Sequence, residues 1–221
     1  MHSHEIETRK KSLKLNDRQR EILVGLLLGD GHLETQNSGR TYRLKIEHSI
    51  RQKEYVDWLF KEFKEWVNTP PQSKSQLIAF KGVKREYEKY WFNTLSSGSF
   101  RFYARQFYLK ERKVAPRLIK KLLSPLSLAV WYMDDGSIKS KVHSTVLFNT
   151  HGFDDGSIQY LRRALDEKFG VKSTVREQRE GRQIYLLSET INKFRDLIIP
   201  SIHPSMRYKL PDIWLTQLPK K

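Results

Sequence analysis

The chain has 221 residues, 38% apolar and 30% charged, which is enough apolar material for a packed core and argues against wholesale disorder. Its 41 lysines and arginines exceed its 25 acidic residues, and the formal charge of +16 is typical of a protein with a polyanionic partner, above all nucleic acid. The absence of cysteine excludes disulfides, cysteine nucleophiles and thiolate zinc sites. The longest apolar run, ILVGLLL, and the charged first fifteen residues predict neither a membrane span nor a secretion signal.

The first strongly periodic segment is NDRQREILVGLLLGDGHL, residues 16–33. Asn16 or Asp17 can cap a helix, the apolar run continues it, and the GDG at 29–31 ends it. Gly25 and Gly29 are four residues apart and therefore lie on one helix face. Because a helical glycine costs about 1 kcal/mol relative to alanine, the pair predicts close approach by another backbone.

The segments that follow alternate between strand and helix patterns. Residues 42–48 alternate apolar and charged side chains, which predicts a half-buried strand, and residues 51–67 carry aromatic side chains at helical spacing. Residues 75–82 and 87–95 are predicted to be strands. Residues 100–109 and 117–123 are predicted to be short helices.

The same pattern then begins again. We predict a helix over 124–135 with Ser124 as its cap, a strand over 144–150, and a helix over 154–170 that Gly170 ends. A hairpin over 171–188 and a helix over 188–199 follow. We interpret the chain as a twofold repeat of helix, two strands, helix, two strands, helix, with an offset of about 105 residues, that between Asp30 and Asp135.

The string DDGSI occurs twice, at 134–138 and at 154–158, in different contexts. The second copy begins an amphipathic helix, where Asp154 or Asp155 can cap backbone N–H groups and the helix dipole favours negative charge. The first copy ends an apolar helix, where the dipole disfavours a carboxylate. Its counterpart is therefore the LGDG at 28–31, which also ends an apolar helix.

A carboxylate at the end of each apolar helix needs a compensating partner. If the two helices pack side by side, Asp30 and Asp135 converge with the nearby helix-end carbonyls, and a divalent cation relieves the repulsion between the carboxylates. Oxygen ligands of this kind suit Mg²⁺, which supports phosphodiester hydrolysis. The alternative is that both aspartates are ordinary helix stops.

LVGLLLGDG (23–31) and LAVWYMDDG (128–136) resemble the two copies of the motif that names the LAGLIDADG homing endonucleases. The resemblance covers nearly the whole chain and is closest to the omega-intron mitochondrial type, through GLLLGDG, PLSLAVWYMDDG, VLFNT and MRYKLP. It implies an α+β fold of two pseudo-twofold-related αββαββα halves, residues 1–115 and 116–221. A central two-helix interface joins the halves, and a saddle of antiparallel strands lies on DNA. Val130-Trp131 is bulkier than Gly25-Leu26, so the interface is expected to be asymmetric.

The resemblance also implies site residues. Asp30 and Asp135 correspond to the metal-binding catalytic acids, and the carbonyls of Gly29 and Asp134 are expected to add metal contacts. A basic residue near each metal is a family feature, which RKVAP and RYKLP supply as Lys113 and Lys209. In a chain with 41 basic residues, a solvated or phosphate-contacting lysine is the plainer interpretation of both.

DNA contacts are expected from strand faces that carry Arg, Lys, Asn or Gln, since these side chains reach base edges in the major groove. Each candidate also has a plain interpretation as a solvated side chain, and several are expected to contact only phosphate. The candidates are Arg43, Lys45, Lys139, Lys141, Asn149, Lys172, Thr174, Arg176, Gln178, Gln183 and Tyr185.

The predicted function is a metal-dependent, site-specific double-strand DNA endonuclease that uses Mg²⁺, for which Mn²⁺ is expected to substitute. Its expected partner is double-stranded DNA, and it is expected to act as a monomer with no membrane contact. We expect it to be soluble and intracellular, in a mitochondrion, another organelle or a bacterial cytoplasm. The alternatives are an intron RNA maturase on the same fold and a non-cleaving DNA-binding regulator.

Overall fold

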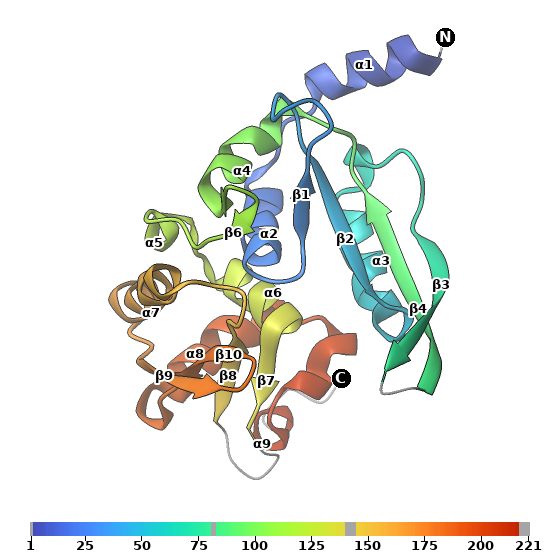
Figure 1. Cartoon of the computed structure of the whole chain (residues 1–221). Helices are drawn as coiled ribbons and strands as arrows, with labels where there is room; N and C mark the ends of the chain where they lie inside the picture. Colours follow the sequence, from blue (N-terminus) through green and yellow to red (C-terminus); the bar gives the residue numbers. More distant parts are fainter. Residues whose placement is uncertain (1, 81–82, 140–144, 217–221) are drawn as a thin grey trace. The chain divides into compact units, whose positions relative to one another are not determined.

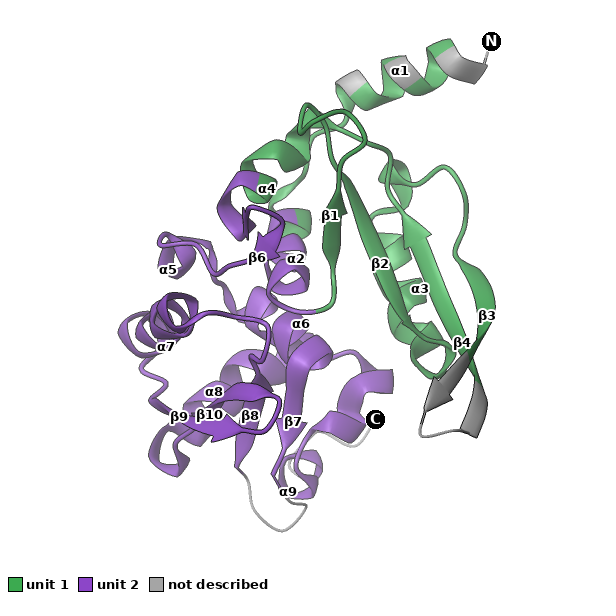
Figure 2. Cartoon of the chain, in the orientation of Figure 1, with its two compact units in different colours: residues 1–19, 30–104 green, residues 20–29, 105–221 purple. Residues whose placement is uncertain are grey.

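The computed structural model describes residues 2–80, 83–139 and 145–216, and they form two compact units (Figure 2). The first unit comprises residues 1–19 and 30–104, and the second comprises residues 20–29 and 105–221. Among the described residues, no helix combines the length and apolar character needed to cross a bilayer.

The predicted repeat of helices and strands is present (Figure 1). Its first copy consists of α2 (Asp17–Leu28), β1 (His32–Glu34), β2 (Arg43–Ser49), α3 (Lys53–Glu62), β3 (Gln72–Phe80), β4 (Val83–Asn93) and α4 (Arg101–Phe107). Its second copy consists of α6 (Pro125–Asp135), β7 (Gly136–Ile138), β8 (Val146–Asn149), α7 (Asp155–Phe169), β9 (Ser173–Gln178), β10 (Gly181–Leu186) and α8 (Ile191–Ile198). The class is α+β, as predicted.

Two four-stranded antiparallel sheets have matching strand orders, β1-β2-β4-β3 and β7-β8-β10-β9. Lys45 faces Asn93 in the first sheet, and Gln183 faces Asn149 in the second. Since residues directly opposite each other share a sheet face, this register places polar side chains together on one face of each sheet.

The opposite faces form the cores. In the first unit, Leu44, Ile46 and Phe92 are buried, and α3 packs on β2 and β4. In the second unit, α6 packs on β8, where the Trp131 and Phe148 rings stack with centroids 3.8 Å apart. Burial of apolar side chains such as these supplies the main driving force for each core.

Several elements were not predicted from the sequence. They are α1 (His2–Ser12), the short strands β1 and β7, the hairpin of β5 (Tyr108–Leu109) and β6 (Arg112–Lys113), and α9 (Asp212–Leu215). Of the predicted short helices, 117–123 is reduced to α5 (Ile119–Leu122), and the helix predicted over 188–199 begins as a 3₁₀ turn at Ser188–Thr190. Helix α1 has no amphipathic pattern, and Arg9 anchors it by donating to the backbone carbonyls of Glu65 and Val67.

Within the second unit, residues 20–28 of α2, and Gly29 just after it, pack closely against α6. A Cβ placed on Gly25 would lie 2.6 Å from both the Ser127 carbonyl oxygen and Val130 Cβ. Val130 therefore occupies the space that a side chain at position 25 would need. The asymmetry predicted for this interface thus takes a definite form, in which a larger residue on α6 faces a glycine on α2.

Replacing Gly25 with alanine should destabilise the protein, although alanine favours a helix more than glycine does. The added methyl group collides with a backbone carbonyl, and overpacking of this kind costs about 1–3 kcal/mol. Urea denaturation should show a lower midpoint for Gly25→Ala. The matched control is Gly156→Ala in α7, where the nearest atom to the added Cβ lies at 3.6 Å and stability should be kept or raised. Equal responses at the two positions would contradict the proposed collision.

The second DDGSI copy begins α7 as predicted, with Asp154 as the N-cap. The Ser157 N–H donates to Asp154 Oδ1 at 2.7 Å, and the backbone and hydroxyl hydrogen bonds of Ser157 lower the pKa of Asp154.

Asp154→Ala should therefore lower the free energy of unfolding by about 1 kcal/mol at neutral pH. Folding lowers the pKa of Asp154, so the stability difference between the wild type and Asp154→Ala is complete above the unfolded-state pKa of about 3.9. This difference disappears as the pH falls through the folded-state pKa of Asp154. A pH series of thermal melts measures it, and a difference that persists undiminished at pH 2 would count against the cap.

Candidate active site

Asp30 lies in the first unit, two residues after α2 ends. Its carboxylate is about half exposed, and its Oδ2 lies 3.5 Å from Nδ1 of His48, a buried residue on the core side of β2. The carboxylate is therefore accessible to a ligand on one side and contacts an imidazole on the other. This contact was not predicted from the sequence, although His48 alternates in step with Leu44 and Ile46 and so belongs to the core face of the strand.

Asp135 lies in the second unit as the last residue of α6 and is partly exposed. Asn149, on the polar face of β8, donates from Nδ2 to the Asp135 backbone carbonyl and to Ser137 Oγ, both at 3.0 Å. Asn149 was predicted to contact DNA. In the structure its amide also fixes the end of the helix that carries Asp135.

Two lysines contact the residues that precede the motif acids. Lys113 donates from Nζ to the Gly29 carbonyl, and Lys209 donates from Nζ to the Asp134 carbonyl at 2.5 Å. Gly29 and Asp134 are equivalent positions of the repeat, and the two lysines are the pair predicted from RKVAP and RYKLP. The two carbonyls predicted as metal contacts therefore each use one lone pair for a lysine, and a carbonyl oxygen has two.

Lys209 is held at both ends by α6. The Tyr132 hydroxyl donates to the Lys209 backbone carbonyl at 2.7 Å, and Tyr132 lies two residues before Asp134, whose carbonyl Lys209 Nζ contacts. Burial raises the pKa of Tyr132, so the phenol stays protonated and can donate. The equivalent residue on α2 is Leu27, which cannot make this hydrogen bond.

Asp134 is buried where α6 meets α2. Its side chain occupies the position next to Gly29, where an added Cβ would lie 2.4 Å from both Asp134 Cβ and Oδ2. Gly29 therefore makes room for an acidic side chain inside the helix pair.

The polar face of the first sheet carries Arg43 and Lys45 among acidic residues. Arg43 donates from Nε and Nη2 to Glu34 Oε2 at 3.0 and 2.7 Å, and Lys45 Nζ lies 3.3 Å from Glu47 Oε2. Partial burial favours a higher pKa for Glu47, but the ammonium groups of Lys89 and Lys45 outweigh it, and the pKa is lowered. The predicted DNA-binding cations of this face are thus already ion-paired.

The polar face of the second sheet is built differently. Gln183 donates to Asn149 Oδ1 at 2.7 Å, Tyr185 donates to Gln183 Oε1 at 3.3 Å, and the Arg176 guanidinium lies 4.4 Å from the Tyr185 ring centroid. Thr174 faces Tyr185 across the ladder. The predicted residues Thr174, Arg176, Gln183 and Tyr185 therefore share one face with Asn149.

The remaining predicted DNA contacts lie at the margins of this face. Gln178 is the exposed last residue of β9, and Lys139 is exposed just after β7. Lys172 lies one residue before β9 begins, and its backbone N–H donates to Thr190 Oγ1. Its ammonium group lies 3.2 Å from Glu189 Oε1. Lys141 lies outside the described residues.

The chemistry of these groups suits a hard cation and a phosphate. The donors at the motif ends are carboxylate and carbonyl oxygens, which Mg²⁺ prefers, and the partial exposure of Asp30 and Asp135 leaves each carboxylate reachable. A lysine beside each motif end can counter negative charge on a phosphoryl oxygen. The residues present therefore fit a divalent cation.

Known proteins resemble this chain over most of its length. The model of the LAGLIDADG DNA endonuclease family matches residues 20–194. DNA endonuclease I-ChuI of Chlamydomonas applanata is 27% identical over 90% of this chain and 97% of its own length. Cytochrome b mRNA maturase bI2 of Saccharomyces cerevisiae is 33% identical over 86% of this chain, but only 46% of its own length.

A solved structure, the homing endonuclease I-WcaI bound to its DNA recognition sequence, has a TM-score of 0.84 and 25% identity to this chain. The match covers 93% of this chain and 91% of that one. Together with the two motif copies and the paired lysines, these matches identify the chain: it belongs to the LAGLIDADG DNA endonuclease family.

Proposed function

We propose that this protein is a homing endonuclease, which cuts both strands of DNA at one long target site. The observation that carries the proposal is the matched arrangement at the two motif ends. Lys113 contacts the Gly29 carbonyl just before Asp30, and Lys209 contacts the Asp134 carbonyl just before Asp135. Because one chain supplies both acids and both lysines, a monomer suffices for cutting two strands.

In this proposal Asp30 and Asp135 each supply a carboxylate ligand to a divalent metal, with Mg²⁺ as the physiological ion and Mn²⁺ as a substitute. When bound, the metal neutralises phosphate charge and makes coordinated water more acidic. Lys113 and Lys209 place an ammonium group beside each acid, where it opposes negative charge on the phosphate or orients the attacking water. Asn149 keeps the α6 end in position by donating to the Asp135 carbonyl.

The polar faces of the two sheets are the proposed DNA-binding surfaces. Amide and guanidinium groups there match base edges in the major groove, and the lysines match phosphates. On the second sheet the hydrogen bonds among Asn149, Gln183 and Tyr185 fix these groups before DNA arrives. On the first sheet Arg43 must exchange Glu34 for a DNA acceptor.

Asp30→Asn and Asp135→Asn should each abolish double-strand cleavage while leaving target affinity nearly unchanged. Asparagine keeps the shape of the side chain but removes the charge that holds the metal, so we expect a loss of at least about a hundredfold in rate. Cleavage is measured on a plasmid bearing the target in Mg²⁺, and binding by fluorescence anisotropy on a labelled duplex.

The control uses the second DDGSI copy. Asp155→Asn changes the equivalent letter of the same string at the start of α7 and should cut at the wild-type rate. Full double-strand cutting by the Asp30→Asn, Asp135→Asn double variant would sink the assignment of these acids.

Affinity for DNA should fall steeply with salt, and Glu34→Gln should make the dependence steeper. Removing this carboxylate releases Arg43 to contact phosphate, while Lys45 keeps Glu47 as a partner. Nonspecific affinity therefore rises, and the slope of log K against log salt grows by about 1. The ratio of the affinity for target DNA to the affinity for random DNA should decrease. Titrations at several salt concentrations measure both effects.

Glu167→Gln in α7 is the matched control, since its partner Lys120 lies outside the polar face of either sheet. It should leave the slope at the wild-type value. The ion-pair account of the first face fails if the Glu34 and Glu167 variants give the same slope.

A maturase role is the second candidate, because relatives named cytochrome b mRNA maturase bI2 share 33% and 31% identity with this chain. A cleavage selection on a randomised DNA library with Mg²⁺, run beside a splicing assay on intron RNA, separates the two. DNA cutting at one site without splicing assistance supports the endonuclease. Splicing assistance without DNA cutting would replace it with the maturase.

A further inference from the structure

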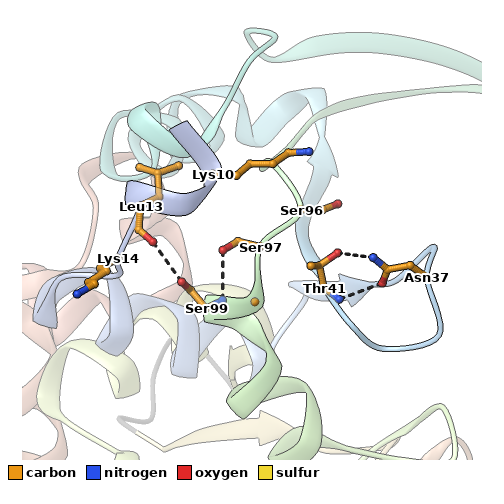
Figure 3. A pocket seen from close by; sticks show the side chains of 9 residues that line it. Lys10, Leu13, Lys14, Asn37, Thr41, Ser96, Ser97 and Ser99 are labelled. Carbon is orange, nitrogen blue, oxygen red and sulfur yellow. Dashed lines mark hydrogen bonds between the residues drawn. The ribbon is translucent and has the colours of Figure 1, made fainter. Parts of the chain in front are cut away.

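The first unit contains a hollow of about 490 Å³ that the polar sheet face does not include (Figure 3). Three segments far apart in the sequence line it: the end of α1, the loop between β1 and β2, and the turn after β4. The lining residues are Lys10, Leu13, Lys14, Asn37, Thr41, Ser96, Ser97, Gly98 and Ser99. Its volume is in the range of small-molecule sites, about 300–1,000 Å³.

The walls of the hollow are held together by hydrogen bonds (Figure 3). Ser99 Oγ donates to the Leu13 carbonyl at 3.2 Å, which ties the turn after β4 to the segment after α1. Asn37 and Thr41 bond each other twice, both at 2.9 Å, which closes the loop between β1 and β2. The hollow therefore exists before any ligand binds.

The chemistry of the lining selects an anion. Two lysines, Lys10 and Lys14, are among the nine lining residues, all within the described chain, and none of the nine is acidic. Ser97 is 95% buried, and its Oγ accepts the Ser99 N–H at 3.2 Å, so its own hydroxyl proton remains to donate. Thr41 Oγ1 likewise accepts from Asn37 and retains its proton. Ammonium groups with fixed hydroxyl donors suit a phosphate.

The position of the hollow indicates which phosphate. Lys45 pairs with Asn93, so the start of β2 and the end of β4 lie at the same end of the first sheet. Thr41 and Ser96 continue these two strands beyond that end, and a ladder contact between Tyr42 and Ser97 joins them. A duplex lying along the polar face of this sheet and running past its end brings its backbone to the hollow.

We propose that this hollow binds a backbone phosphate of the DNA that flanks the base pairs read by the first sheet. The inference rests on the proposed DNA endonuclease function. It adds a contact outside the recognised sequence, one that raises affinity and sets the register of the duplex without reading bases.

The first arm of the test needs no target sequence. Thymidine 3′,5′-bisphosphate is titrated into the full chain and followed by amide chemical shifts. The proposal expects saturable shifts at Thr41 and Ser97–Ser99, which the Lys10→Gln, Lys14→Gln variant loses. Absence of shifts at these amides at millimolar probe overturns the proposal, and since this arm involves no cleavage, its outcome is independent of whether the protein cuts DNA.

The second arm compares duplexes that carry the selected target with and without about ten added flanking base pairs. The wild type should bind the longer duplex more tightly, and the lysine variant should lose about tenfold on it, with a salt slope lower by 1–2. The variant should still cut the short duplex. Lys61→Gln, Lys64→Gln removes the same charge from the α3 side of the same unit and should keep the gain from the flank.

Two further outcomes of the duplex comparison would contradict the proposal. If the flank gives the wild type no gain, or both double variants lose it equally, the hollow is not a site for flanking DNA. If the lysine variant binds both duplexes normally but loses affinity for a structured intron RNA, the hollow binds a phosphate of RNA. That result overturns the proposal of a flanking DNA phosphate.

Discussion

The arrangement of the candidate active site depends on how closely α2 and α6 approach each other. At Gly25 the backbone lies so near Ser127 and Val130 that no side chain fits, and at Gly29 the space is taken by Asp134. This contact fixes the ends of both apolar helices, from which the two motif acids continue. The lysine contacts follow from it, since Lys113 and Lys209 reach carbonyls whose positions the helix pair determines. Apolar burial alone would not position the ends so closely, because it is not directional.

Local sequence patterns predicted most of the helices and strands, because their signals lie within a few residues. The cap at Ser124, the glycines facing α6 and the alternation in β2 are examples. The strands β1 and β7 have three residues each, too few for an alternation to show, and α1 is held by Arg9 on distant carbonyls. Three features join residues that only the folded chain brings together: the contact of His48 with Asp30, the ion pairs of the first sheet, and the hollow. For the candidate site, the resemblance predicted a set of acids and lysines, but not that both lysines bond to carbonyls.

The formal charge of +16 describes the whole chain but not its individual surfaces. The first sheet face combines its cations with Glu34 and Glu47, so electrostatic attraction to DNA is reduced where bases would be read. The second face uses amides, a phenol and one stacked guanidinium. Surfaces of this kind limit nonspecific binding, because binding to the wrong sequence breaks ion pairs without restoring hydrogen bonds. Attraction to the polyanion is then supplied by cations elsewhere, including those of the hollow.

The hydrogen bond from Tyr132 to the Lys209 backbone has a consequence for the order in which the two DNA strands would be cut. It holds one lysine from both ends, and Leu27 leaves the other without this phenol. If each lysine serves the cut of one strand, the two cuts start from different degrees of preorganisation and need not have the same rate. The slower cut then follows the faster, and a duplex nicked in a defined strand accumulates between them. An internal duplication would thus have produced an enzyme whose two chemical steps can diverge, since each half can change without the other.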